Sequence, residues 1–202
     1  MRRRSLGWLG ITAIALVLSL LFSSGSATMS PAALSTAVLT AQAPVDEGPE
    51  LSAAAAPALS GTYEAPQGDF QIGILDGATS TTAGGAPLFI VADGSLAYSV
   101  VTLPLESATP LTDIALVELA RQALDTGEGF QTQTFTSVPE GLQIAWTGRL
   151  SQGAGPPQPV SGSVLARQQG TAVYLLVVAA LDSATAQVPQ VLVTLADSLE
   201  FL

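Results

Sequence analysis

The chain contains no lysine, histidine or cysteine, and three of its six basic residues stand at its very beginning. Without histidine and cysteine it cannot build a Ser-His-Asp triad, a thiol nucleophile or a zinc site with nitrogen or sulfur ligands. Without lysine it cannot form a Schiff base. The lack of cysteine also excludes disulfides and a bacterial lipoprotein attachment site. Carboxylates are the main catalytic groups that remain.

Positive charge is almost absent from the rest of the chain. Only Arg121, Arg149 and Arg167 follow the first four residues, and they face 16 carboxylates, so the formal charge from residue 28 onward is −13. A surface of this sign repels nucleic acid and anionic lipid, which excludes nucleic-acid binding. A partner recruited by charge should present a basic surface.

The N-terminal residues have the layout of an export signal. Arg2–Arg4 precede an uncharged apolar run of 17 residues, Leu6–Phe22, and small residues follow. With Gly25 and Ala27 at the third and first positions before the cleavage point, we predict that residues 1–27 are removed as a signal peptide. The alternative is an uncleaved membrane anchor, because 17 residues lie at the short end of the spanning range.

The composition changes after the signal and again near residue 63. Residues 28–62 contain ten alanines, four prolines and no aromatic residue. Such a segment has little surface to bury, so we predict a flexible linker, with a short helix over residues 31–42 as the alternative. Residues 63–202 show no repeat and no second linker, which predicts a single globular domain.

Strand patterns dominate the first half of this domain. Phe70, Ile72 and Ile74 alternate with small or polar residues, as in a half-buried strand. Asp76-Gly77 and Asp93-Gly94 are typical of turns. Apolar runs on both sides of the second turn predict an antiparallel hairpin.

A first helix should begin at Pro110 to Thr112 and end near Gly127. Glu118 and Asp125 lie three and four residues from Arg121, a spacing that predicts local ion pairs on its outer side. Helical spacing connects Ile114, Val117, Ala120, Arg121 and Leu124, and Leu116 and Ala123 widen the apolar face that should point inward. A second helix should close the chain, with Pro189 in its first turn and an apolar face of Val188, Val191, Leu192, Leu195 and Leu199.

Four further strands are predicted between the helices, over residues 130–136, 141–150, 160–169 and 171–181. In the second of them Leu142, Ile144, Trp146 and Leu150 share one face. The last is continuously apolar, which indicates a central strand covered on both faces. The expected fold class is therefore α+β, a mainly antiparallel β-sheet sandwiched by helices.

Several stretches of the chain resemble the PsbP-like family. They are residues 63–74, 112–124, 141–150, 162–180 and 197–202, the last resembling the family's terminal helix and its ending. The resemblance implies an α/β/α sandwich and a role beside a membrane complex, since the best-known members are extrinsic lumenal proteins of photosystem II. The chain lacks the family's tryptophan in the turn after the first strand, the docking lysines and the histidines of proposed metal sites. The resemblance therefore supports the family's fold more strongly than its photosystem function.

Candidate functional residues have two interpretations each. Asp69, Asp76 and Asp93 lie near strand ends and would serve as an acid and base pair or as calcium ligands if they converged. As turn formers, Asp76 and Asp93 need no such role. Trp146 and Tyr174 would line a ligand pocket or, as we favour from their apolar alternation, pack in the core.

Arg149 and Arg167 lie on neighbouring predicted strands. They would form a small cationic site or, as the excess of carboxylates favours, structural pairs with acids. Gly84-Gly85 has neither the lysine nor the helix of a phosphate-binding loop.

We therefore predict no catalytic residue, no cofactor and no metal site. The expected function is an exported, non-catalytic binding or assembly factor in the thylakoid lumen or periplasm. Its partner would be a basic surface of photosystem II or of another membrane complex. The alternatives are an envelope protein with a ligand pocket under residues 80–87, and a carboxylate-based hydrolase.

Overall fold

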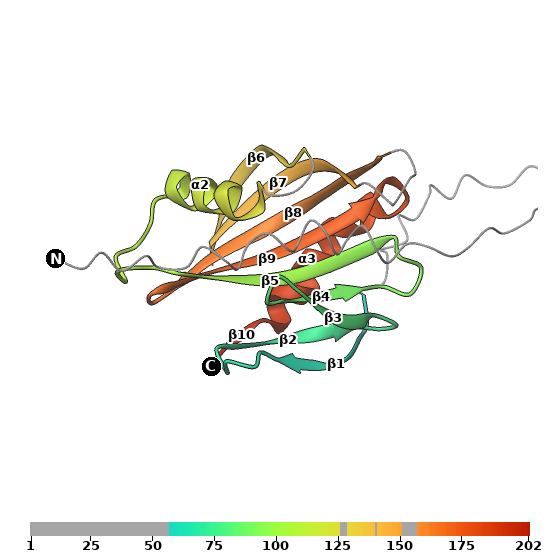
Figure 1. The fold of residues 1–202 in the computed structure, drawn as a ribbon, viewed down its shortest axis with the longest axis horizontal. Helices are drawn as coiled ribbons and strands as arrows, with labels where there is room; N and C mark the ends of the chain where they lie inside the picture. Colours follow the sequence, from blue (N-terminus) through green and yellow to red (C-terminus); the bar gives the residue numbers. More distant parts are fainter. Residues whose placement is uncertain (1–56, 126–128, 140, 151–156) are drawn as a thin grey trace, which may run out of the picture.

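The fold is built on two antiparallel sheets (Figure 1). The computed structural model describes residues 57–125, 129–139, 141–150 and 157–202. In these residues a seven-stranded sheet has the order β3-β4-β5-β9-β8-β7-β6, and a three-stranded sheet has the order β1-β2-β10. The large sheet comprises β3 (Thr79–Ala83), β4 (Ala86–Ile90), β5 (Leu96–Pro104), β6 (Gln131–Val138), β7 (Gly141–Leu150), β8 (Gln158–Gln169) and β9 (Ala172–Leu181). The small sheet comprises β1 (Leu59–Glu64), β2 (Phe70–Leu75) and β10 (Glu200–Phe201).

Helices lie on both faces of the large sheet, as the sequence predicted. Strand β9 is the middle strand, between β5 and β8, and side chains on both of its faces are buried. Helix α2 (Asp113–Leu124) packs on β6, β7 and β8, and helix α3 (Val188–Ser198) packs on β8, β9 and β2. A 3-10 helix, η1 (Asp182–Gln187), leads into α3. The α+β fold class is confirmed.

The core on the α3 face joins the two sheets. Phe89 and Tyr98 stack with ring centroids 4.6 Å apart, and Ile72 and Leu195 in the same cluster are fully buried. The predicted apolar face of the last helix is confirmed, because Val188, Val191, Leu192 and Leu195 are buried, with Leu199 buried just after the helix. The small sheet therefore lies on the same side of the large sheet as α3.

Helix α2 begins where the sequence predicted, because the Thr112 side chain accepts a hydrogen bond from the backbone N–H of Ala115. Its inward face is Leu116, Ala120, Ala123 and Leu124. The prediction that Ile114 points inward is wrong, since this side chain is 75% exposed. The buried stripe of α2 is therefore shifted by about one position around the helix from the stripe that the sequence predicted.

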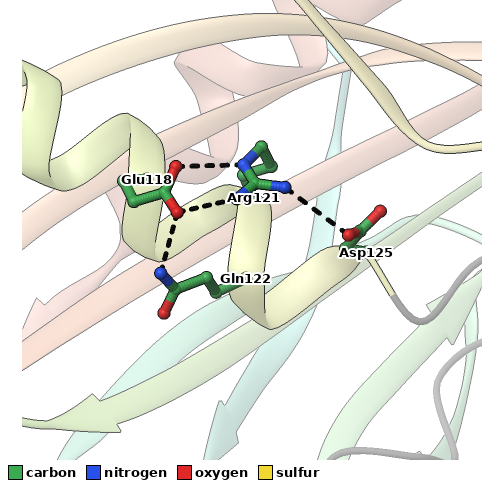
Figure 2. A network of polar contacts seen from close by, with 4 residues as sticks. All are labelled: Glu118, Arg121, Gln122 and Asp125. Carbon is green, nitrogen blue, oxygen red and sulfur yellow. Dashed lines mark hydrogen bonds and ion pairs between the residues drawn. The ribbon is translucent and has the colours of Figure 1, made fainter.

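The predicted ion pairs on α2 are confirmed (Figure 2). Arg121 contacts Glu118 at 2.7 Å and Asp125 at 3.6 Å, and Gln122 also donates to Glu118. The hydrogen bonds from Arg121 and then Gln122 lower the pKa of Glu118 to about 2. Because these groups are exposed, the pairs add little to stability. They do pair the positive charge of Arg121 with carboxylates of its own helical segment.

Three short strands escaped the sequence patterns. Strand β1 begins within the segment predicted as linker, so a strand of the described part of the chain starts before Tyr63, at Leu59. Strand β3 is polar and almost wholly exposed, and β10 has only two residues. The prediction that residues 197–202 resemble a terminal helix is corrected, because the helix ends at Ser198 and β10 pairs with β2.

Several sequence predictions concern residues outside the described ranges. They are the signal peptide or anchor over residues 1–27, the linker up to residue 56 and the helix terminator Gly127. Within the described ranges, the structure contains no helix that is long and apolar enough to cross a membrane.

Candidate functional site

The three candidate carboxylates do not meet at one point. Asp69 precedes β2 and Asp76 follows it, so about 20 Å of extended strand separates them. Asp76 and Asp93 lie in turns that approach each other, since a Cβ placed on Gly77 would be 3.9 Å from Ala92. Among the described residues, no group of three acidic side chains is arranged to hold a metal ion. The three carboxylates therefore do not converge, and only the turns of Asp76 and Asp93 lie close together.

Asp93 has the structural role that its turn predicted. Its carboxylate accepts hydrogen bonds from the backbone N–H of Ser95 at 2.9 Å and from the Ser95 hydroxyl at 2.8 Å. These bonds lower the pKa of Asp93, the backbone bond most strongly. Asp93 therefore keeps its negative charge and closes the turn between β4 and β5.

Asp69 and Tyr174 lie near the opposite end of β2. Asp69 accepts a hydrogen bond from the Thr102 hydroxyl at 3.2 Å. Tyr174 is 7% exposed and packs against Phe70 and Phe201, with ring centroids 6.1 and 4.6 Å away. Burial, and then the charge of Asp69, raise the pKa of Tyr174. The prediction that Tyr174 packs in the core is confirmed.

Arg149 and Arg167 do not form one cationic site. They pair in register with Pro159 and Tyr174, so the length of β8 separates them. Arg149 is exposed, whereas Arg167 donates to the backbone carbonyl of Ala196 at 3.2 Å, in the last turn of α3. A cation at this end of a helix complements the helix dipole. Arg167 thus connects α3 to the large sheet.

We expect Arg167→Met to lower the free energy of unfolding by about 1–2 kcal/mol, because it removes the charge and the hydrogen bond but keeps most of the apolar side chain. Arg149→Met is the matched control and should change stability by less than about 0.5 kcal/mol, as for other surface positions. Urea denaturation followed by circular dichroism measures both. Equal effects would show that the contact with α3 adds nothing.

Residues 80–87 do not form a loop over a pocket. They belong to the hairpin of β3 and β4, in which Ala83 pairs with Ala86. Gly84 and Gly85 make the two-residue turn with φ of 59° and 87°, values that favour glycine. The segment predicted as a loop is therefore a hairpin.

A different feature stands out on the α2 side of the large sheet. Beyond the area that α2 covers, one row of paired residues crosses five strands and places small residues between two large ones. The row is Ile90, Ala97, Ala179, Gly162 and Trp146. A neighbouring pair, Leu88 and Ser99, extends the same surface. We call these seven residues the distal face.

Apart from Trp146, which also packs against the cluster of α2, the distal face has no helix above it in the described part of the chain. Leu88, Ile90 and Ala97 form a buried cluster with Ala83, and its members come only from β3, β4 and β5. The apolar side chains of α2 belong instead to a cluster over β7, β8 and β9. From β4 to β7 the row spans four strand spacings, about 19 Å, which is wide enough for a helix about 10 Å across.

Trp146 stands at one end of the distal face. The prediction that it packs in the core holds in part, because its side chain is partly buried and packs against the cluster that contains the α2 side chains. It packs on Phe130, with ring centroids 5.2 Å apart, and beside Val160 and Ala179. Its indole N–H is buried and has no hydrogen-bond partner. An acceptor brought to this position would satisfy it.

Sequence reasoning missed the distal face because its small residues carry no chemical signature. Ala97, Gly162 and Ala179 come from three strands, and only the register of the sheet brings them together. The signal available in advance was Gly162. A glycine inside a strand pattern marks a close approach of another group.

The structure is similar to solved structures of low sequence identity. For cyanobacterial PsbP (CyanoP) from Synechocystis sp. PCC 6803, the TM-score is 0.46 and the identity 13%, covering 77% of this chain and 99% of that one. For LpqN, involved in cell envelope biogenesis of Mycobacterium tuberculosis, the values are 0.40 and 14%, covering 65% and 82%. A Bacteroides thetaiotaomicron protein gives 0.46 and 10% over 72% of this chain, which spans about half (49%) of that protein.

No family model matches the chain, and neither does any curated protein. The structural similarities all have TM-scores below 0.5. They are likenesses of fold and assign no activity, substrate or partner.

Proposed function

We propose that this protein is an exported, non-catalytic binding factor that docks an apolar helix with a cationic end, contributed by a membrane complex on the lumenal or periplasmic side. The distal face carries this proposal, because it offers apolar side chains and an unpaired indole N–H without a described helix above them.

The negative charge of the protein favours a partner helix with a cationic end. Eleven carboxylates and three arginines lie in the described residues. Arg121 is paired within α2 and Arg167 contacts α3, so little positive charge opposes a basic partner. Electrostatic complementarity then speeds the encounter with the partner and orients it, in addition to the apolar contact. The PsbP-like resemblance of residues 63–202 makes photosystem II the first natural complex to test.

A synthetic helix of leucine and alanine with three arginines at one end tests the proposal. The protein is expressed with its own leader, and the exported form is purified and its mass measured. If residues 1–27 are removed, Trp146 is the single tryptophan and reports binding directly. We expect saturable binding that shifts its emission to the blue and weakens as salt rises.

Ala179→Glu should weaken this binding by at least about tenfold, or about 1.4 kcal/mol, because it places a charge in the apolar contact. Val193→Glu is the control, since Val193 is 60% exposed on α3, on the other side of the sheet. Equal binding by both variants, or no saturable binding, would contradict the proposal. Hydrolytic turnover that is lost in a folded Asp69→Asn variant would favour the hydrolase instead.

A further inference from the structure

We infer that this protein forms a dimer in which strand β6 pairs antiparallel with β6 of a second copy. Strand β6 is the last strand of the large sheet, and among the residues that the structure describes no strand pairs with its outer edge (Figure 1). Such an edge presents unpaired N–H and C=O groups, which are a template for another strand. The distal face contains no residue of β6, so this inference does not depend on the proposed function.

Strand β6 lacks the charges that usually keep edge strands from pairing. Its residues Gln131–Val138 include no charged residue and no proline, although the described part of the chain has eleven carboxylates and three arginines. A second copy carries the same negative charge, and like charges across an interface are costly. Self-association therefore favours a strand without charge. A β-bulge lies between Thr132 and Phe135, but the pairing of β6 with β7 is regular from Phe135 to Val138.

Two large apolar side chains are exposed beside this edge. Phe135 on β6 is 49% exposed and Ile114 on α2 is 75% exposed. Phe135 lies on the α2 side of the sheet, because it pairs with Ile144, which is buried in the cluster of α2. The hydrogen bond from the Ser137 hydroxyl to Asp113 places the first turn of α2 above the same part of β6. The edge therefore has an apolar margin that a second molecule would bury.

The other outer strands fit a second copy less well. Strand β3, at the opposite edge of the large sheet, is also uncharged, but its exposed residues are only threonine and serine. Strand β1, at the edge of the small sheet, contains Glu64. Among the outer strands in the described ranges, β6 alone combines an uncharged edge with an exposed aromatic side chain.

A second copy covers this margin more completely than an extended peptide would, because a peptide paired with β6 would leave Ile114 in water. When β6 pairs antiparallel with itself, the two-fold axis is perpendicular to the sheet, so both α2 helices lie on one face. Helix α2 packs on β6, β7 and β8, so its axis lies near β7, and three strand spacings, about 14 Å, would separate the two helices. A helix with its side chains is about 10–12 Å across, so Ile114 and Phe135 of both copies would fill the gap.

A pairing centred on Thr136 suits the side chains of both copies. Thr136 would lie opposite Thr136 of the second copy, and Phe135 would lie opposite Ser137. The two Phe135 residues would then be diagonal neighbours about 7–8 Å apart, a distance that aromatic side chains can bridge. This register centres the contact on the regular part of β6.

Sedimentation velocity of the purified exported form at several concentrations measures the dimer. We expect its dissociation constant to fall as salt rises, because salt screens the repulsion between two acidic copies. Binding of the synthetic helix should respond to salt in the opposite direction. Thr136→Glu should raise the dissociation constant by about tenfold or more, because it places two carboxylates opposite each other. Thr81→Glu adds the same charge at an exposed position of β3 and should leave the constant unchanged.

Two further variants identify the contact. Thr136→Glu mixed with Thr136→Lys should form a mixed dimer, since opposite charges then face each other. Ile114→Ser should weaken the dimer and Val193→Ser should not, although both side chains are exposed on helices. Circular dichroism checks that each variant is folded. A monomer up to about 1 mM, the weak end of specific association, would overturn the inference. Equal effects of Thr136→Glu and Thr81→Glu, or no mixed dimer, would also overturn it.

Discussion

Gly162→Ala should lower the free energy of unfolding by about 3 kcal/mol, the upper end of the cost of overpacking a core. A Cβ on Gly162 would lie 1.9 Å from the backbone carbonyl oxygen of Val178 and 2.9 Å from the indole nitrogen of Trp146. The carbonyl belongs to β9, the middle strand, and cannot move without disturbing its pairing. One methyl group therefore strains three adjacent strands.

Gly61→Ala is the matched control, because Gly61 also lies within a strand but its nearest neighbour, the Ile74 side chain, would be 3.9 Å from the new Cβ. Without a clash, alanine in a strand is favoured over glycine by roughly 0.5–1 kcal/mol. Urea denaturation of both variants, followed by circular dichroism, measures the difference. A loss at Gly162 no larger than at Gly61 would show that the strands readily accommodate the methyl group.

The same position links the fold to the distal face. Gly162 lets the Trp146 ring lie close to β8, next to Ala179. Displacing the ring would change the surface on which a helix is proposed to dock. A Gly162→Ala variant that still folds should therefore also alter Trp146 emission, which separates a local displacement from global loss of stability.

Sequence periodicity predicted the parts of the fold that are buried on a regular pattern. The continuous apolar run of β9 placed it at the centre, and the spacing of Val188, Val191 and Leu195 placed the last helix. Patterns of this kind are reliable because burial repeats with the period of the backbone. Helix α2 was predicted for the same reason. The face that it turns toward the sheet was not predicted correctly, because residues of similar hydropathy flank its buried stripe.

The sequence could not predict features set by pairing between distant segments. Strands β1, β3 and β10 have little burial of their own and exist because a neighbouring strand offers hydrogen bonds. Arg167 was expected to pair with an acid, but its hydrogen bond to α3 goes to the backbone carbonyl of Ala196, 29 residues away. The distal face has the same origin, since it is a product of strand register rather than of any local motif.

Tyr98→Phe should cost about 3 kcal/mol, because one hydroxyl satisfies two backbone groups that water cannot reach. Tyr98 is 1% exposed, and its hydroxyl accepts from the Leu75 N–H and donates to the Gly73 carbonyl, each at 3.0 Å. Both groups lie on the edge of β2 where β10, with two residues, provides no partner. The Ser198 hydroxyl accepts from the Gly73 N–H at 3.0 Å on the same edge.

Side chains thus supply hydrogen bonds to the edge of β2 that β10 leaves unpaired, and the bonds of Tyr98 connect the small sheet to the large one. Removing the oxygen leaves a donor and an acceptor buried without partners, each costing roughly 1–3 kcal/mol. Tyr63→Phe is the control, because Tyr63 is partly exposed and contacts Phe89 through its ring. It should cost less than about 1 kcal/mol, as for a surface-like change. Similar losses in both variants would mean that the two backbone bonds are not important.

The dependence of stability on pH offers an independent test of the same contact. Burial raises the pKa of Tyr98 to about 12, although the hydrogen bond from Leu75 acts in the opposite direction. The unfolded chain loses this proton near the ordinary value of 10. Between these values the folded state holds the extra proton, so stability is complete below pH 10 and falls as pH rises toward 12. In Tyr98→Phe this part of the decline should disappear, and a decline equal to that of the parent chain would assign it to other groups.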